Sequence, residues 1–109
     1  MGSLPRRPRA ALSGALLALA TLPAAAQDAN ALNLRALAAT CANCHGTNGR
    51  AVDGASVPGL AGMPASYMIE QLRAFKAGTR PATVMHQLGK GFSDAQIEAI
   101  AGFFAAQKK

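Results

Sequence analysis

Five consecutive residues carry the strongest chemical signal in this chain: Cys41, Ala42, Asn43, Cys44 and His45. The pattern C-x-x-C-H is typical of covalent attachment of a c-type haem. Two thiols three residues apart lie on one side of a helical turn, so both would reach the two vinyl groups along one porphyrin edge. The imidazole of the following residue would then bind the iron, since histidine is a common haem ligand.

Three other chemistries use the same residue types. A thioredoxin-like C-x-x-C expects a βαβ setting, which the sequence does not indicate. A zinc site requires four ligands, which the two cysteines of the motif together with His45 and His86 would supply by number. The adjacent Cys44 and His45, however, rarely converge on one tetrahedral ion. A structural disulfide would close a strained loop, and we therefore favour haem over all three alternatives.

The opposite side of the iron decides the function, because a thioether ligand suits electron transfer and an open side would make a haem enzyme or gas sensor. Met63 and Met68 are close to the motif in sequence, and Met68 falls on the apolar face of an expected helix, which favours a place in the core. We expect Met85, in an irregular loop forty residues after His45, to be the sixth ligand. Its neighbour His86 offers bis-histidine ligation, but we interpret it as a loop histidine at the surface.

Two helices are expected on either side of the first long loop. The first, residues 33–42, has apolar side chains at i, i+3, i+4 and i+7 spacing. The second, residues 64–77, has Pro64 at its first position, where proline is favoured, and Gly78 just beyond its end.

A third helix is expected to begin at Ser93, which has capping-box spacing to Gln96. It carries an apolar stripe of Ile97, Ile100, Ala101 and Phe104. Residues 46–62 and 79–92 are rich in glycine and proline and are expected to be irregular loops. No segment alternates as a strand does, so the sequence predicts an all-α fold in which long loops wrap a bound group.

The first 26 residues predict a secretory signal peptide. Arginines form a positive start, residues 10–22 are apolar, and Ala24 to Ala26 supply the small residues of a cleavage site. Cleavage would leave residues 27–109 in the periplasm, without stable membrane insertion; an uncleaved membrane anchor is the alternative. The mature part has eight Lys and Arg against five Asp and Glu, a net charge of +3. These charges are scattered, so the sequence does not support nucleic-acid binding.

The chain resembles a class I cytochrome c over nearly all of its mature part. The resemblance is carried by the segments T-C-A-N-C-H-G-T-N-G, V-P-G-L-A-G-M, Y-M-I-E-Q-L-R-A-F-K-A-G-T-R and T-V-M-H-Q-L-G-K-G-F-S-D. It is most similar to short bacterial periplasmic monohaem cytochromes, including the haem subunits of flavocytochrome c sulfide dehydrogenases. The resemblance implies three main helices with long loops around one haem c.

The resemblance also implies roles for individual residues. Cys41 and Cys44 would form two thioether bonds to the haem, and His45 and Met85 would be the axial ligands. A carbonyl from Pro58 would accept a hydrogen bond from the imidazole and raise its basicity.

Three further residues are expected near the haem or in the helix packing. Leu60 would pack against the porphyrin. Tyr67 would lie either near a propionate or in the core. Gly102, inside the last helix, indicates close packing against the first helix, because an interior helical glycine costs about 1 kcal/mol relative to alanine.

The function expected from these features is one-electron transfer between redox proteins, with a flavoprotein dehydrogenase or a terminal oxidase as possible partners. The alternative is an obligate haem subunit of a dehydrogenase complex, which would present a contiguous apolar patch. Four cations of the mature chain are expected to steer an acidic partner: Arg73, Lys76, Arg80 and Lys90.

Overall fold

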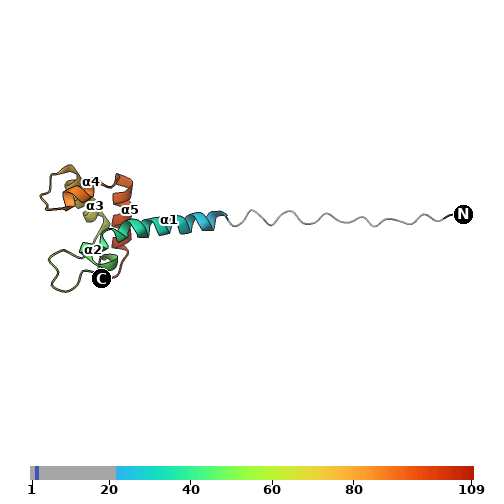
Figure 1. The fold of residues 1–109 in the computed structure, drawn as a ribbon, viewed down its shortest axis with the longest axis horizontal. Coiled ribbons are helices and arrows are strands. Elements are labelled where there is room, and N and C mark those ends of the chain that lie inside the picture. The colour runs from blue at the N-terminus through green and yellow to red at the C-terminus, as the bar shows by residue number, and fades with distance from the viewer. Residues whose placement is uncertain (1, 3–21) are drawn as a thin grey trace.

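The computed structural model describes Gly2 and residues 22–109. This part of the chain contains five α-helices and a 3-10 helix: α1 Leu22–Ala39, α2 Ala42–His45, η1 Thr47–Gly49, α3 Ala65–Ala77, α4 Met85–Lys90 and α5 Asp94–Ala105 (Figure 1). The described residues contain no strand, which confirms the predicted all-α class with three main helices. The expected leader, residues 1–26, lies outside the described residues except for Gly2 and the first residues of α1.

Helix α5 forms the centre of the core. It packs against both α1 and α3. The predicted stripe on α5 is confirmed, since its four side chains are at most 3% exposed: Ile97, Ile100, Ala101 and Phe104. Three of these residues, Ile100, Ala101 and Phe104, form a buried cluster with Ala38 from α1 and Met68 from α3. This confirms the assignment of Met68 to the core. Burial of this apolar surface is the main force that holds the three helices together.

The predicted capping box at the start of α5 is confirmed. The backbone N–H of Gln96 donates to Oγ of Ser93 at 3.2 Å, and the backbone N–H of Ser93 donates to Oε1 of Gln96 at 2.8 Å. These bonds satisfy two donors that a helix start otherwise leaves without partners. Helix α5 therefore begins at a defined residue, which fixes its register against α1 and α3.

Two ion pairs join α3 to α5. Arg73 contacts Glu98 at 2.8 Å, and Nζ of Lys76 contacts Asp94 at 2.9 Å and also donates to the carbonyl oxygen of Phe92 at 2.8 Å. Two of the four cations expected to steer a partner are thus neutralised within the chain. The expectation that all four cations are free to steer an acidic partner is therefore wrong.

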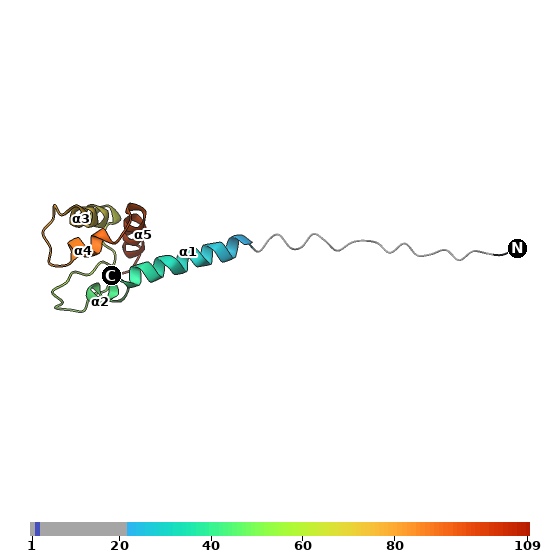
Figure 2. The ribbon, with the colours of Figure 1, turned by 45° about the horizontal axis from the view of Figure 1, so that its top comes forward.

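Helix α1 differs from the helix expected over residues 33–42. It begins at Leu22 and ends at Ala39, and its N-terminal part projects away from the other helices (Figures 1 and 2). Thr40 Oγ1 donates to the carbonyl oxygen of Leu37 at 2.7 Å, which competes with continuation of the helix beyond this point. No helix in the described part is long and apolar enough to cross a bilayer.

Helix α4 corrects the expectation that residues 79–92 are irregular. It begins at Met85 and packs against α3 through Gly89. A Cβ atom at Gly89 would lie 3.2 Å from the backbone nitrogen of Lys76, so glycine allows the two helices to approach closely. The close contact expected at Gly102 does not occur, because Gly102 is exposed and a Cβ atom there would meet no atom within 4 Å.

Candidate cofactor site

Helix α2 holds the C-x-x-C-H motif at the end of α1. The backbone N–H groups of Cys44 and His45 both bond to the carbonyl oxygen of Cys41, at 3.3 and 3.0 Å. This single helical turn separates the two cysteines by three positions, which places their side chains on one side of the turn. The geometry fits two bonds to one edge of a flat ring.

The two thiols are free but differ in environment. Cys41 is half-buried, and Cys44 is exposed. Burial raises the pKa of the Cys41 thiol, and a side-chain contact with Thr40 partly opposes that shift. Cys41 is therefore protonated at neutral pH, and its sulfur is held against the core, where Cys41 packs beside the buried cluster.

The imidazole of His45 is fixed in one orientation. The side chain is 8% exposed, and its Nδ1 atom lies 2.7 Å from the carbonyl oxygen of Pro58. Because a carbonyl oxygen can only accept, Nδ1 carries the proton and donates. In the neutral imidazole the Nε2 atom then has a free lone pair, which is the form of histidine that binds a metal. The hydrogen bond implied for Pro58 by the resemblance is present.

Gly49 lets the chain fold back so that Pro58 reaches His45. The backbone N–H groups of Leu60 and Ala61 both donate to the carbonyl oxygen of Gly49, at 2.8 and 3.1 Å, which closes the loop. Gly49 has a φ of +76°, and a Cβ atom there would lie 2.8 Å from Ala61 and from the ring of Phe104. A side chain at this position would therefore push the loop away from the core.

Met85 and His86 lie at the start of α4, and both are half-buried. The Nδ1 atom of His86 is buried and has no hydrogen-bond partner among the described residues. His86 therefore differs from the loop histidine at the surface that was expected, because it lies in α4 and its ring is only partly exposed. The role of Met85 as a ligand stays a prediction.

Two other residues expected near the haem differ in exposure. Leu60 is partly buried and packs against the core cluster, as does Met63. Tyr67 is 46% exposed, which rules out the alternative that it is an ordinary core tyrosine. Proximity of either residue to a haem stays a prediction.

The donor set fits a covalently bound haem better than the alternatives. Two free thiols on one side of a helical turn precede a histidine whose Nε2 is available. Residues 22–109 contain no group of three or more His, Cys, Asp or Glu side chains arranged to hold a metal ion, which disfavours the zinc site. The same residues contain no strand, which removes the βαβ setting of a thioredoxin-like pair.

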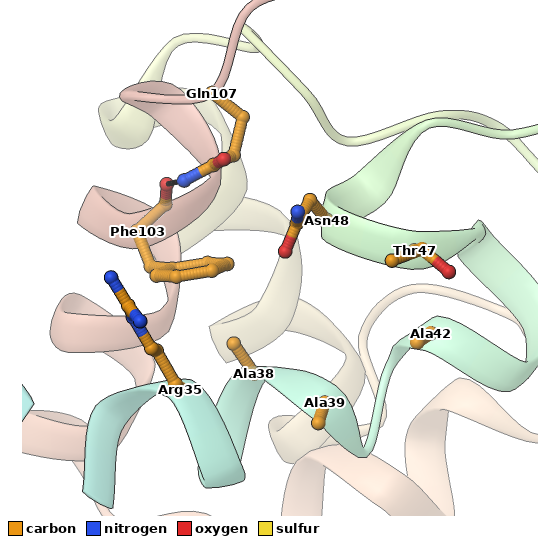
Figure 3. Close-up of a pocket in the computed structure, with 8 residues that line it drawn as sticks. All are labelled: Arg35, Ala38, Ala39, Ala42, Thr47, Asn48, Phe103 and Gln107. Atoms are coloured by element: carbon orange, nitrogen blue, oxygen red, sulfur yellow. Dashed lines mark hydrogen bonds between the residues drawn. The ribbon is translucent and has the colours of Figure 1, made fainter. Parts of the chain in front are cut away.

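A pocket adjoins the motif on the side of α1 and α5 (Figure 3). Ala42, between the two cysteines, forms part of its wall. The remaining lining residues are Arg35, Ala38, Ala39, Thr47, Asn48, Phe103 and Gln107. Neither cysteine of the motif nor His45 lines this pocket, so it is separate from the proposed haem site.

Comparison with known proteins places these features in a family. Residues 34–107 match the sequence profile of the family described as Cytochrome c. The match covers the motif, α3, α4 and all of α5, so the resemblance drawn from the sequence motifs is confirmed.

Three relatives illustrate the range of similar proteins. The chain is 41% identical over 71 residues to a thiosulfate dehydrogenase electron acceptor of Thiomonas intermedia, covering 65% of this chain and 33% of the relative. It is 36% identical over 73 residues to the cytochrome subunit of sulfide dehydrogenase of Chlorobaculum tepidum, covering 67% and 64%. It is 33% identical over 72 residues to cytochrome c-554(548) of Halomonas halodenitrificans, covering 63% and 86%. The chain thus spans about a third of the first relative and most of the third.

Proposed function

The chain belongs to the cytochrome c family, and on that premise we propose that it is a periplasmic electron carrier with one haem ligated by His45 and Met85. The observation that carries the proposal is the hydrogen bond from His45 Nδ1 to Pro58, which leaves Nε2 free beside two free thiols. A haem bound there supplies a one-electron change of oxidation state.

The residues of the site hold and tune that group. Cys41 and Cys44 would each form a thioether, which fixes one edge of the ring to α2. His45 would bind the iron through Nε2, and its bond to Pro58 makes the imidazole a stronger electron donor. Burial of this histidine would keep water away from an iron bound at its Nε2 atom.

Met85 is the proposed iron ligand on the side opposite His45. Support comes from its position at the first residue of α4, a helix held against α3 by the close approach at Gly89. A ligand on a packed helix moves little when the iron changes charge, which suits electron transfer. A thioether ligand also raises the reduction potential relative to a second histidine.

Export is the proposed route to the site of haem attachment. Cleavage after Ala26 would shorten α1 and leave Asp28 close to its new N-terminus, where a carboxylate stabilises a helix. The mass of the protein recovered from the periplasm tests this step. A mass that begins at Gln27 supports cleavage, whereas a mass that retains residues 1–26 indicates an uncleaved anchor.

Sulfur-compound dehydrogenases are the proposed class of redox partner. Support comes from the relatives described as a thiosulfate dehydrogenase electron acceptor and as the cytochrome subunit of a sulfide dehydrogenase. Because the second relative is described as a subunit, it also favours the alternative that this chain is an obligate subunit of a dehydrogenase complex. Val84 and Leu88, one turn apart at the start of α4, are 49% and 47% exposed and would belong to such an interface.

Spectra and molecular size together test this proposal. The protein would be produced in a periplasm with haem-attachment machinery and purified. A carrier would be a monomer with a low-spin spectrum and would accept an electron from a small reductant. A subunit would instead be recovered in a stable complex with its dehydrogenase. Loss of the haem on unfolding would contradict covalent attachment.

A further inference from the structure

The pocket beside α2 has the size and composition of a binding site. Its volume is about 390 Å³, within the range of sites that bind small ligands or single side chains. Figure 3 shows Arg35 extending from α1 beside the ring of Phe103, while Asn48 from η1 and Gln107 from the end of α5 face the same space. Phe103 and Gln107 are distant in sequence from the lining residues of α1, α2 and η1, so only the folded chain forms this pocket.

Every polar side chain that lines the pocket can donate a hydrogen bond. The guanidinium of Arg35 forms no ion pair with any described residue. Gln107 uses one N–H of its amide to donate to the carbonyl oxygen of Phe103 at 2.9 Å, which holds the side chain over the ring. The lining contains no Asp or Glu, whereas it contains one cation, two side-chain amides and the hydroxyl of Thr47. This donor set matches an anionic group.

Positive charge also surrounds the pocket. Arg50 follows η1, and its Nε atom donates to the carbonyl oxygen of Lys108 at 2.9 Å, which ties these two cations together next to Gln107. Lys108 and Lys109 are both exposed. The acidic residues nearest in sequence are Asp28, before Arg35 on α1, and Asp53, just after Arg50, and neither forms an ion pair with a described residue. Six Lys and Arg residues in 22–109 form no ion pair with a described residue; two of them, Arg80 and Lys90, lie elsewhere, and the other four belong to this corner: Arg35, Arg50, Lys108 and Lys109.

We propose that this corner, made by α1, η1 and the end of α5, docks an acidic redox partner, one of whose carboxylate side chains enters the pocket and contacts Arg35. This inference rests on the proposed electron-carrier function. Ala42 belongs both to the pocket wall and to the turn between the two cysteines. A partner seated there would therefore lie next to the segment that bears the haem, which favours electron transfer.

A short acidic peptide tests the proposal. Acetylated and amidated hexaglutamate would be titrated at low ionic strength into the reduced, haem-loaded, ¹⁵N-labelled protein. The side-chain amide signals of Asn48 and Gln107 report on the pocket directly. Arg35→Gln is the test variant, and Lys90→Gln is the matched control, since it removes the same charge from α4. The visible spectrum of each sample shows separately whether haem is attached.

The proposal predicts that the peptide shifts the Asn48 and Gln107 signals. It predicts that Arg35→Gln weakens binding by about fivefold or more, whereas Lys90→Gln weakens it by less than about twofold. Lys108→Gln should give an intermediate loss, and it serves as the second variant if Arg35→Gln does not fold.

Three results would overturn the proposal. The first is that Arg35→Gln and Lys90→Gln weaken peptide binding equally. The second is that the peptide shifts NMR signals near all surface cations. The third is that it shifts no signal in a protein whose visible spectrum shows attached haem. Binding to phosphatidylglycerol vesicles without any response to the peptide would assign the corner to a lipid surface and would also overturn it. Absence of haem would instead contradict the proposed function.

Discussion

The Nδ1 atom of His45 lies 2.7 Å from the carbonyl oxygen of Pro58, a residue thirteen positions later in the chain. This bond links the motif at the end of α1 to the segment that leads into α3. It fixes the tautomer and the plane of the imidazole before any group binds to Nε2.

The first prediction concerns this bond. Pro58→Ala retains the carbonyl but loosens the backbone that presents it, so the imidazole donates less electron density. The reduction potential of the haem-loaded protein should rise by up to ~59 mV, the equivalent of a tenfold change in the balance of the two oxidation states. Potentiometric titration measures this shift. An unchanged potential would mean that the bond only positions the ring.

The second prediction concerns the sixth ligand. Met85→Ala should remove the near-infrared band of a thioether–iron bond and lower the potential by ~100 mV or more, within the ~0.8 V that axial ligands span. Met63→Leu is the matched control and should leave both properties unchanged. A Met85→Ala protein that retains the band would assign the ligand elsewhere.

The third prediction concerns Gly46, the residue that follows the motif. Gly46 has φ +82° and ψ 158°, a conformation almost restricted to glycine, and a Cβ atom there would overlap the backbone of Arg50. Gly46→Ala should cost about 3 kcal/mol or more of unfolding free energy and reduce the yield of haem-loaded protein.

Gly54 provides the control for this prediction. It has a φ of +78°, but a Cβ atom there would meet nothing within 4 Å. Gly54→Ala should therefore cost only about 1 kcal/mol, from backbone strain alone. If denaturant titrations showed that Gly46→Ala and Gly54→Ala lose the same unfolding free energy, the packing explanation would be contradicted.

The fourth prediction concerns the core. Ile97 is fully buried, and Ile97→Ala should lower the unfolding free energy by about 3 kcal/mol through lost contacts and a residual cavity. Ala99→Ser, on the exposed side of the same helix, should change it by less than about 0.5 kcal/mol. Denaturant titration of the haem-loaded protein provides both values. A cost below about 1 kcal/mol for Ile97→Ala would contradict the assignment of α5 to the centre of the core.

The fifth prediction concerns pH. The hydrogen bond and charge of Lys76 lower the pKa of Asp94 below its ordinary value of 3.8. The carboxylate therefore stabilises the fold above that value, and the contribution is lost as the pH falls through the lowered pKa. Asp94→Asn should be slightly less stable than the natural chain at neutral pH, and the difference should vanish in acid. A constant difference across this pH range would contradict the ion-pair account.

Local patterns in the sequence predicted the site motif and much of the fold. The stripe from Ile97 to Phe104 and the capping box at Ser93 depend on residues a few positions apart, so the sequence alone reveals them. The C-x-x-C-H spacing likewise defines its own helical turn, α2.

Features that depend on distant segments could not be predicted in this way. Helix α4 contains a glycine that usually indicates a loop, and only its contact with α3 shows why Gly89 is suited to a helix. His86 becomes half-buried only in the folded chain, and ion pairs to α5 neutralise Arg73 and Lys76. The pocket at Arg35 combines three separate segments, and no spacing rule would have found it.

The central claim is that Cys41, Cys44 and His45 hold a haem covalently. The most direct test is to produce the chain with haem-attachment machinery, unfold it in acid and organic solvent, and measure its mass and visible spectrum. The account predicts that the haem stays with the polypeptide, and that Cys41→Ala with Cys44→Ala abolishes this retention. A natural chain that separates from its haem, or never acquires one, would contradict the account.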